Sequence, residues 1–102
     1  HLHVGNLEQA QAFYGDGIGF DKMTWSYPGA LFLGAGGYHH HLGTNLWAGP
    51  LAQPAPPDEA RLLEWTIVLP TAHDVAQVTQ SVQGAGFVVE SAAPADAVAS
   101  DP

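Results

Sequence analysis

The chain of 102 residues lacks cysteine, which excludes a disulfide framework, a thiolate metal site and a cysteine nucleophile. Cations are nearly as scarce, because Lys22 and Arg61 stand against ten carboxylates and leave a formal net charge of −8. This balance excludes a face that neutralises nucleic-acid phosphates and disfavours an anionic membrane surface. The sequence also lacks a secretory signal and a spanning helix, since its longest nearly unbroken apolar run, residues 30–37, is far below ~18–20 residues. We expect a cytoplasmic protein.

The length suits one domain of about 100 residues, and a short pattern occurs in it twice. Strand, helix and strand signals come first, a linker with four prolines follows, and strand, helix and strand signals start again. We therefore divide the domain into a first β-α-β-β-β module (1–48), a linker (49–60) and a partial second module (61–102). The chain starts at His1 without a methionine, so we expect a fragment of a longer protein.

In the first module, alternation predicts a strand over residues 1–4, and Asn6 with Gln9 predicts the capped start of a helix. Apolar spacing continues that helix from Leu7 until three glycines end it. Strands are expected over residues 20–27, 30–35 and 38–47. In the second module we expect a strand over 61–69, a helix opened by Thr71 and Asp74, a strand over 87–90 and a loop over 91–100.

Histidines are concentrated in two of the predicted strands, where residues two apart point to the same side. His1 and His3 form one such pair, and His39 and His41 form the other. In the strand over 38–47, alternation places His39, His41, Gly43, Asn45 and Trp47 on one face, with Tyr38, His40, Leu42, Thr44 and Leu46 on the other. Imidazoles held on a sheet are suited to metal binding, but the same spacing also lines polar pockets or faces solvent. Both interpretations stay open.

Glu64 is the lone charge within residues 62–69. A carboxylate inside an apolar strand needs a metal, a histidine or water as its partner, because burying it unpaired is costly. The alternative is a position on the outer side of the sheet, shared with Arg61. The three tryptophans and Tyr27 are interpreted as packing residues.

Three groups of motifs carry a family resemblance. The opening His-Leu-His-Val-Gly-Asn-Leu-Glu (1–8), followed by Ala12-Phe13-Tyr14 and Gly19-Phe20, resembles the start of a vicinal oxygen chelate domain. This superfamily includes glyoxalase I, bleomycin-resistance proteins and extradiol dioxygenases. The stretch Gly36-Gly37-Tyr38-His39-His40-His41-Leu42-Gly43, with Asn45 and Trp47, is similar to the branch of the bacterial catechol 2,3-dioxygenases. Leu69-Pro70 and Asp101-Pro102 match as well.

The resemblance implies an α+β fold of paired β-α-β-β-β modules, which form an open, curled mixed sheet around a cavity, with the second module incomplete in this chain. It implies a divalent metal (Fe, Mn, Zn or Ni) that chelates two neighbouring substrate oxygens. We also expect a homodimer, because the exposed edges of the sheet and the short second module need to be covered. His41 matches a ligand position, and Glu64 lies where dioxygenases usually supply histidine. The family's first-strand ligand would fall two positions before His1, and its last-strand Glu beyond Pro102.

Two functions follow from the resemblance. The first is a metal-dependent enzyme of the glyoxalase or dioxygenase type, acting on a catechol-like or hemithioacetal-like small molecule. Its metal ligands would be His41 and Glu64, its catalytic groups His39 and His3, and its cavity-lining residues His1, His3, Asn45 and Trp47. The second is a metal-free module that sequesters an aromatic or antibiotic ligand. A partial match of residues 1–15 to a cupin motif is disfavoured, because this stretch has a helix cap and helical periodicity.

Overall fold

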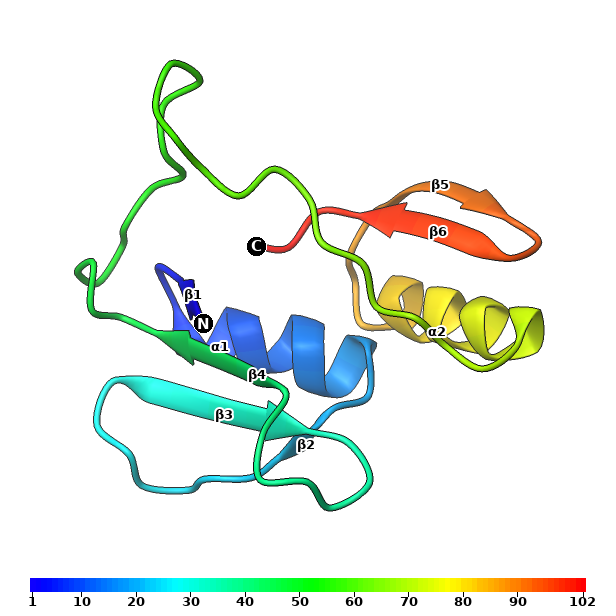
Figure 1. Cartoon of the computed structure of the whole chain (residues 1–102), viewed down its shortest axis with the longest axis horizontal. Helices are drawn as coiled ribbons and strands as arrows, with labels where there is room; N and C mark the ends of the chain where they lie inside the picture. Colours follow the sequence, from blue (N-terminus) through cyan, green and yellow to red (C-terminus); the bar gives the residue numbers. More distant parts are fainter.

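The computed structural model describes residues 1–102, except for the side chains of Ser91 and Ala92. Its larger sheet contains four strands in the order β1-β4-β3-β2. These strands are β1 (Leu2–His3), β2 (Asp21–Lys22), β3 (Ala30–Gly34) and β4 (Leu42–Asn45). β1 runs parallel to β4, and the other pairs are antiparallel (Figure 1). With the helical segment between β1 and β2, this is the expected β-α-β-β-β module, and the fold is α+β.

The helical segment of this module changes its winding after one turn. α1 (Leu7–Ala10) starts at Asn6, whose side chain accepts hydrogen bonds from the backbone N–H groups of Glu8 and Gln9, as the sequence predicts. It continues as a π-helix, η1 (Gln11–Gly17). Phe13 and Tyr14 of η1 are buried. The segment therefore lies over one face of the sheet and contributes its aromatic side chains to the core.

The core lies between this helical segment, the sheet and the second helix, α2 (Ala72–Gly84). Strands β3 and β4 supply Leu31, Leu33 and Leu42, and α2 supplies Val82. η1 and α2 approach closely, since a Cβ added at Gly17 would lie 3.5 Å from the Cα of Val82. Both halves of the chain thus share one hydrophobic core. No helix in the described part of the chain has the length and apolarity needed to cross a membrane.

The second half differs from the expectation in two places. Residues 61–69 form no strand in the described backbone, although their sequence predicts one. A hairpin of β5 (Val89–Ala93) and β6 (Asp96–Ala99) occurs where the sequence predicts a loop over 91–100. The hairpin was missed because an alanine-rich segment gives no alternation of apolar and polar residues, so its backbone pairing leaves no pattern in the sequence. The prediction for α2 is confirmed, with a capping box between Thr71 and Asp74.

Candidate functional site

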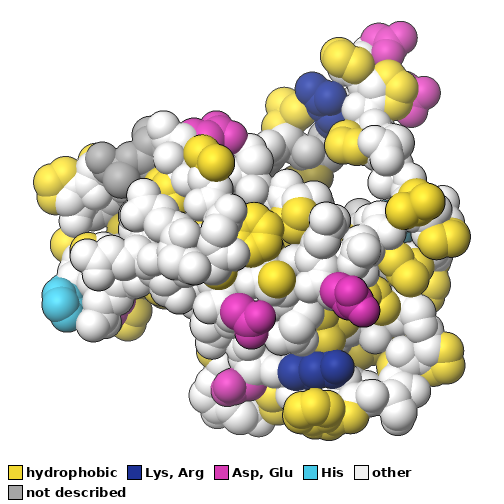
Figure 2. All heavy atoms as spheres, turned by 180° about the vertical axis from the view of Figure 1, so that it is seen from behind, with side chains coloured by type: hydrophobic (Ala, Val, Ile, Leu, Met, Phe, Trp, Pro, Cys, Tyr) yellow, Lys and Arg dark blue, Asp and Glu magenta, His cyan; other side chains and the backbone are white. Residues whose placement is uncertain are grey.

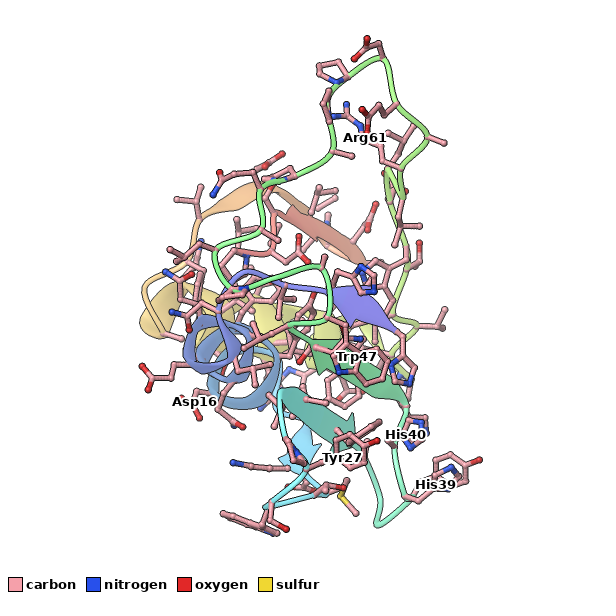
Figure 3. The ribbon with its side chains drawn as sticks, turned by 90° about the vertical axis from the view of Figure 1, so that its left-hand side faces the viewer. Asp16, Tyr27, His39, His40, Trp47 and Arg61 are labelled. Carbon is pink, nitrogen blue, oxygen red and sulfur yellow. The ribbon has the colours of Figure 1, made fainter. Side chains whose placement is uncertain are left out.

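Among the residues that the structure describes, no helix lies over one face of the four-stranded sheet. Leu31 and Leu33 of β3 pair with Thr44 and Leu42 of β4 and are buried with them beneath the helices. The residues between them therefore point to the other side, because side chains alternate along a strand. Figure 3 shows the helical segment on one side of the strands, with Trp47 and His40 on the other. We call this side the open face.

Aromatic and imidazole rings gather on the open face and define what we call the open-face cluster. His1 lies nearly parallel to Trp47 (ring centroids 6.0 Å apart, interplanar angle 20°) and edge-on to Phe32 (5.6 Å). The His40 ring lies 5.0 Å from Phe32 and 6.1 Å from His1. Tyr27 completes the cluster at 5.6 Å from Phe32. These five side chains come from five separate segments of the chain.

Gly43 is the reason that His1 can lie flat against the sheet. A Cβ atom added at Gly43 would lie 2.7 Å from Cε1 of His1, closer than real Cβ atoms approach other heavy atoms. Gly43 pairs with Phe32 of β3, and because it has no side chain it leaves a shallow depression beside the phenyl ring. Any larger residue at this position would displace the imidazole and break up the open-face cluster.

Asn45 is fully buried, and its side chain is only half satisfied. Its Oδ1 accepts a hydrogen bond from the backbone N–H of Trp47 at 3.1 Å, which fixes the orientation of the amide. Its Nδ2 has no partner among the described residues. A buried donor without a partner costs about 1–3 kcal/mol, so this atom is available to an acceptor that reaches it. The neighbouring strand places His3 in register with Asn45.

The three consecutive histidines do not follow the predicted alternation. The sequence predicts His39 and His41 on the same face as Gly43, with His40 opposite, but β4 begins only at Leu42. Residues before it lie in a turn that follows Gly36 and Gly37, both with positive φ, so the period of two does not extend back to them. His40 joins the open-face cluster instead. The sequence signal for this is the Gly36-Gly37 pair, which marks a turn.

His41 lies away from the open-face cluster. Its ring lies 6.4 Å from Phe20 and 4.9 Å from Tyr38, and its Nδ1 accepts a hydrogen bond from the backbone N–H of Ala35 at 3.2 Å. A backbone N–H can only donate, so Nδ1 carries no proton and the neutral ring holds its proton on Nε2. Metal-binding histidines usually have the opposite arrangement, with the second nitrogen donating its N–H to a carbonyl or carboxylate.

The other predicted site residues are exposed. His3 and His39 are both at the surface, and the His39 ring lies 4.2 Å from Tyr38 and 4.7 Å from His40. Glu64 is also exposed, within the segment 61–69 that forms no strand. Among the side chains that the structure describes, no three His, Cys, Asp or Glu groups lie close enough together to hold a metal ion. The described residues therefore do not fit a complete metal site.

The sequence predicts His1, Asn45 and Trp47 as cavity-lining residues, and the rings of His1 and Trp47 lie side by side in the open-face cluster; it gives no such prediction for Phe32 and His40. Phe32 lies between two buried leucines, Leu31 and Leu33, and reads as part of an unbroken apolar strand. Its opposite orientation follows only when β4 is known to pair with β3.

Comparison with known proteins gives one match. Over 92 residues, which make up 88% of the chain, the sequence is 47% identical to a catechol-2,3-dioxygenase from Bacillus subtilis (strain 168). The matched stretch covers 32% of that protein, so the chain spans about a third of the length of its relative. No family model and no solved structure matches the chain.

Proposed function

We propose a function from the premise that this chain is a homologue of a catechol-2,3-dioxygenase and so belongs with the vicinal oxygen chelate superfamily that its motifs resemble. The chain is part of a dioxygenase-type enzyme that acts on a small molecule with two neighbouring oxygens, such as a catechol. The 47% identity over 88% of the chain is the observation that carries this proposal. A hemithioacetal, the substrate type of glyoxalases, is the alternative within the same superfamily.

The open-face cluster supplies the substrate surface in this proposal. An aromatic ring binds against Phe32 and Trp47, whose rings offer apolar and stacking contacts. The imidazoles of His1 and His40 lie beside these rings, where a neutral imidazole can accept the proton of a substrate hydroxyl. The unpaired Nδ2 of Asn45 donates to a substrate oxygen once the side chains above it part. His3 and His39 stay predicted catalytic groups at the edge of this surface.

A divalent metal is implied by the relative's class, but the side chains described here do not assemble its site, so we derive no step through it. The ligand roles of His41 and Glu64 stay predictions. For His41 the role requires the hydrogen bond from Ala35 to break, so that Nδ1 binds the metal and Nε2 keeps its proton, or so that the proton moves from Nε2 to Nδ1 and Nε2 binds. Elemental analysis for Fe, Mn, Zn and Ni tests both residues: near-stoichiometric metal that is lost in His41→Ala or Glu64→Ala supports the prediction, and metal unchanged in both variants contradicts it.

The test of the proposed substrate surface is a titration of the chain with catechol, followed by two-dimensional NMR. We expect shifts at Phe32, His40 and Trp47, and affinity reduced about tenfold or more in Trp47→Ala, because the indole supplies a large part of the apolar contact. His73→Ala, on the exposed surface of α2, is the matched control and should bind as the unchanged chain does. Shifts confined to other elements, or equal affinity in Trp47→Ala, would contradict the proposal.

The second candidate is a metal-free module that sequesters an aromatic ligand. Its support is the same open-face cluster together with the missing ligand set among the described side chains. Oxygen uptake separates the two: catechol-dependent oxygen consumption supports the enzyme, while catechol binding without consumption, after loading with Fe or Mn, supports sequestration. The homodimer also stays a proposal, which light scattering of the purified chain tests.

A further inference from the structure

A hollow lies away from the open face, at the end of the sheet where β4 begins. Its volume is about 460 Å³, within the roughly 300–1,000 Å³ of small-molecule sites. Residues from three distant stretches line it: Ile18, Gly19 and Phe20, then Ala35 and His41, then 65–69. In Figure 1, residues 65–69 form the yellow-green coil that runs past the sheet towards α2. We call this hollow the His41 cavity.

The walls of the His41 cavity are apolar, and two aromatic rings stand in them. Phe20 lies nearly parallel to the His41 ring, with an interplanar angle of 28°, and Trp65 lies 6.1 Å from the buried Tyr14. Ile67 and Leu69, within the segment 65–69, are partly buried. Surfaces of this kind favour a flat apolar ligand, because ring contacts add to the gain from removing apolar area from water.

His41 gives this apolar cavity a polar group with a defined role. Since Nδ1 accepts from the N–H of Ala35, which also lines the cavity, the neutral ring offers Nε2–H as a donor. A donor in an apolar site selects ligands that carry an acceptor, because a ligand without one leaves the donor unpaired. The Thr66 hydroxyl and the backbone N–H groups of residues 65–69 also lie at the His41 cavity, so variants at His41 are needed to assign the preference to its imidazole.

Charge decides against an anionic ligand. Lys22 and Arg61 are the cations of a chain with net charge −8, and neither is among the described residues that line the cavity. Figure 2 shows the two cationic side chains well apart on one face. Lys22 lies over the Trp25 ring at 5.1 Å, and Arg61, labelled in Figure 3 directly after the linker, donates to the carbonyl of Ala55. A carboxylate in the cavity would meet no fixed cation.

We propose that the His41 cavity binds a small neutral aromatic molecule with one acceptor oxygen, the ring against Phe20 and Trp65 and the oxygen on Nε2–H of His41. This site is separate from the open-face cluster, because His40 and His41 lie in different surroundings although they are adjacent in the chain. The inference does not depend on the proposed enzymatic function, and it gives His41 a role other than metal binding.

Three probes of similar size test this proposal on the whole chain by two-dimensional NMR. Acetophenone has a ring and an acceptor, ethylbenzene has the ring alone, and benzoate adds a negative charge. We expect acetophenone to shift the signals of Gly19, Ala35 and the Trp65 indole, with ethylbenzene about 3- to 10-fold weaker, as one hydrogen bond predicts. Benzoate should be weaker than acetophenone. Equal affinity of the three probes, absence of binding, or shifts centred on Phe32 and Trp47 would overturn the proposal.

Variants at His41 distinguish a ligand preference that depends on its N–H donor from nonspecific apolar binding. His41→Phe keeps a ring but removes the donor, so acetophenone and ethylbenzene should bind alike, whereas His41→Gln retains an N–H donor and should restore the preference. His73→Phe makes the same change on the exposed surface of α2 and should leave the preference intact. A preference that survives His41→Phe overturns the role of His41. Because these readings come from the His41 cavity, they are independent of catechol binding on the open face.

Discussion

Thr44 and Asn45 are adjacent, both fully buried, and both hold a polar atom without a partner among the described residues. Alternation sends them to opposite sides of β4. Thr44 points into the core between the sheet and the helices, where a lone hydroxyl serves no visible purpose. Asn45 points to the side of the open face, where the proposed substrate would use an unpaired donor. The same defect is thus structural at one residue and a candidate functional feature at the next.

Thr44→Val should raise the free energy of unfolding by about 1 kcal/mol, because it removes a buried hydroxyl with no partner and keeps the shape of the side chain. Urea denaturation measures this as a higher midpoint with an unchanged slope. Thr66→Val makes the same change at an exposed position and should alter stability by less than about 0.5 kcal/mol. Lower stability in Thr44→Val would show that the hydroxyl has a partner in solution.

Single residues also show where prediction from the sequence ends. The cavity-lining role predicted for His1, Asn45 and Trp47 stays a prediction, while the structure places the rings of His1 and Trp47 together. Strand alternation predicts His41 rather than His40 on the face of Asn45 and Trp47, and this is wrong because β4 begins only at Leu42 and the residues before it form a turn. The backbone N–H of His41 donates to the carbonyl of Leu33. Which carbonyl accepts this hydrogen bond decides between a turn and a strand at His41, and the sequence does not specify the acceptor.

At the scale of elements, local signals predict helices better than strands. Both helix starts are confirmed, since Asn6 and Thr71 cap within their own turn and need no distant partner. Strands need partners. Residues 61–69 have the composition of a strand but pair with no strand among the described residues. The alanine-rich β5 and β6 form strands because they pair with each other. Pairing decides between these outcomes, and it is a property of the whole fold.

Thr71→Ala should destabilise the chain by about 1 kcal/mol, because the Thr71 hydroxyl accepts from the N–H of Asp74 and the reciprocal carboxylate bond is left alone. Thermal unfolding followed by circular dichroism measures the change. Thr66→Ala, at a threonine outside any helix, serves as its control. If both variants melt together, the capping box contributes nothing to α2.

Hydrogen exchange should divide the elements in the same way. The N–H groups of residues 62–69 make no backbone hydrogen bond to any described residue, so we expect them to exchange within about the time of unstructured peptides. The amide of Leu33, fully buried in β3, should exchange at least a thousandfold more slowly, close to the limit of global unfolding. Slow exchange at residues 62–69 would mean that this segment pairs in solution.

At the scale of the molecule, one hydrogen bond joins the first module to the end of the described chain. The hydroxyl of Tyr14, on η1 in the core, donates to Oδ2 of Asp101 at 2.5 Å. Burial first, and then the Asp101 carboxylate, raise the pKa of Tyr14 far above its usual value of about 10. The tyrosine stays protonated in the folded chain at alkaline pH, while an unfolded chain ionises it.

Stability should therefore fall as pH rises beyond about 10. A folded pKa raised above the unfolded one gives a contribution that is complete below the unfolded pKa and is lost above it. Between pH 9 and 11 we expect a loss of about 1 kcal/mol that Tyr14→Phe does not share, measured by denaturation at each pH. Absorbance at 295 nm gives a second reading: the Tyr14 phenol, whose pKa is raised by burial, should ionise only when the chain unfolds. Ionisation of Tyr14 while the chain is still folded would contradict the expectation.

The distance along the chain between Tyr14 and Asp101 also has a consequence for synthesis on the ribosome. The two residues are 87 positions apart. At about 5–20 residues per second, between about 4 and 17 s pass from the incorporation of Tyr14 to that of its partner. Throughout that interval η1 and the first strands exist while the acceptor of the Tyr14 hydroxyl does not. The nascent first module therefore keeps the Tyr14 hydroxyl hydrated during this interval, and the hydrogen bond forms only after residue 101 has been made.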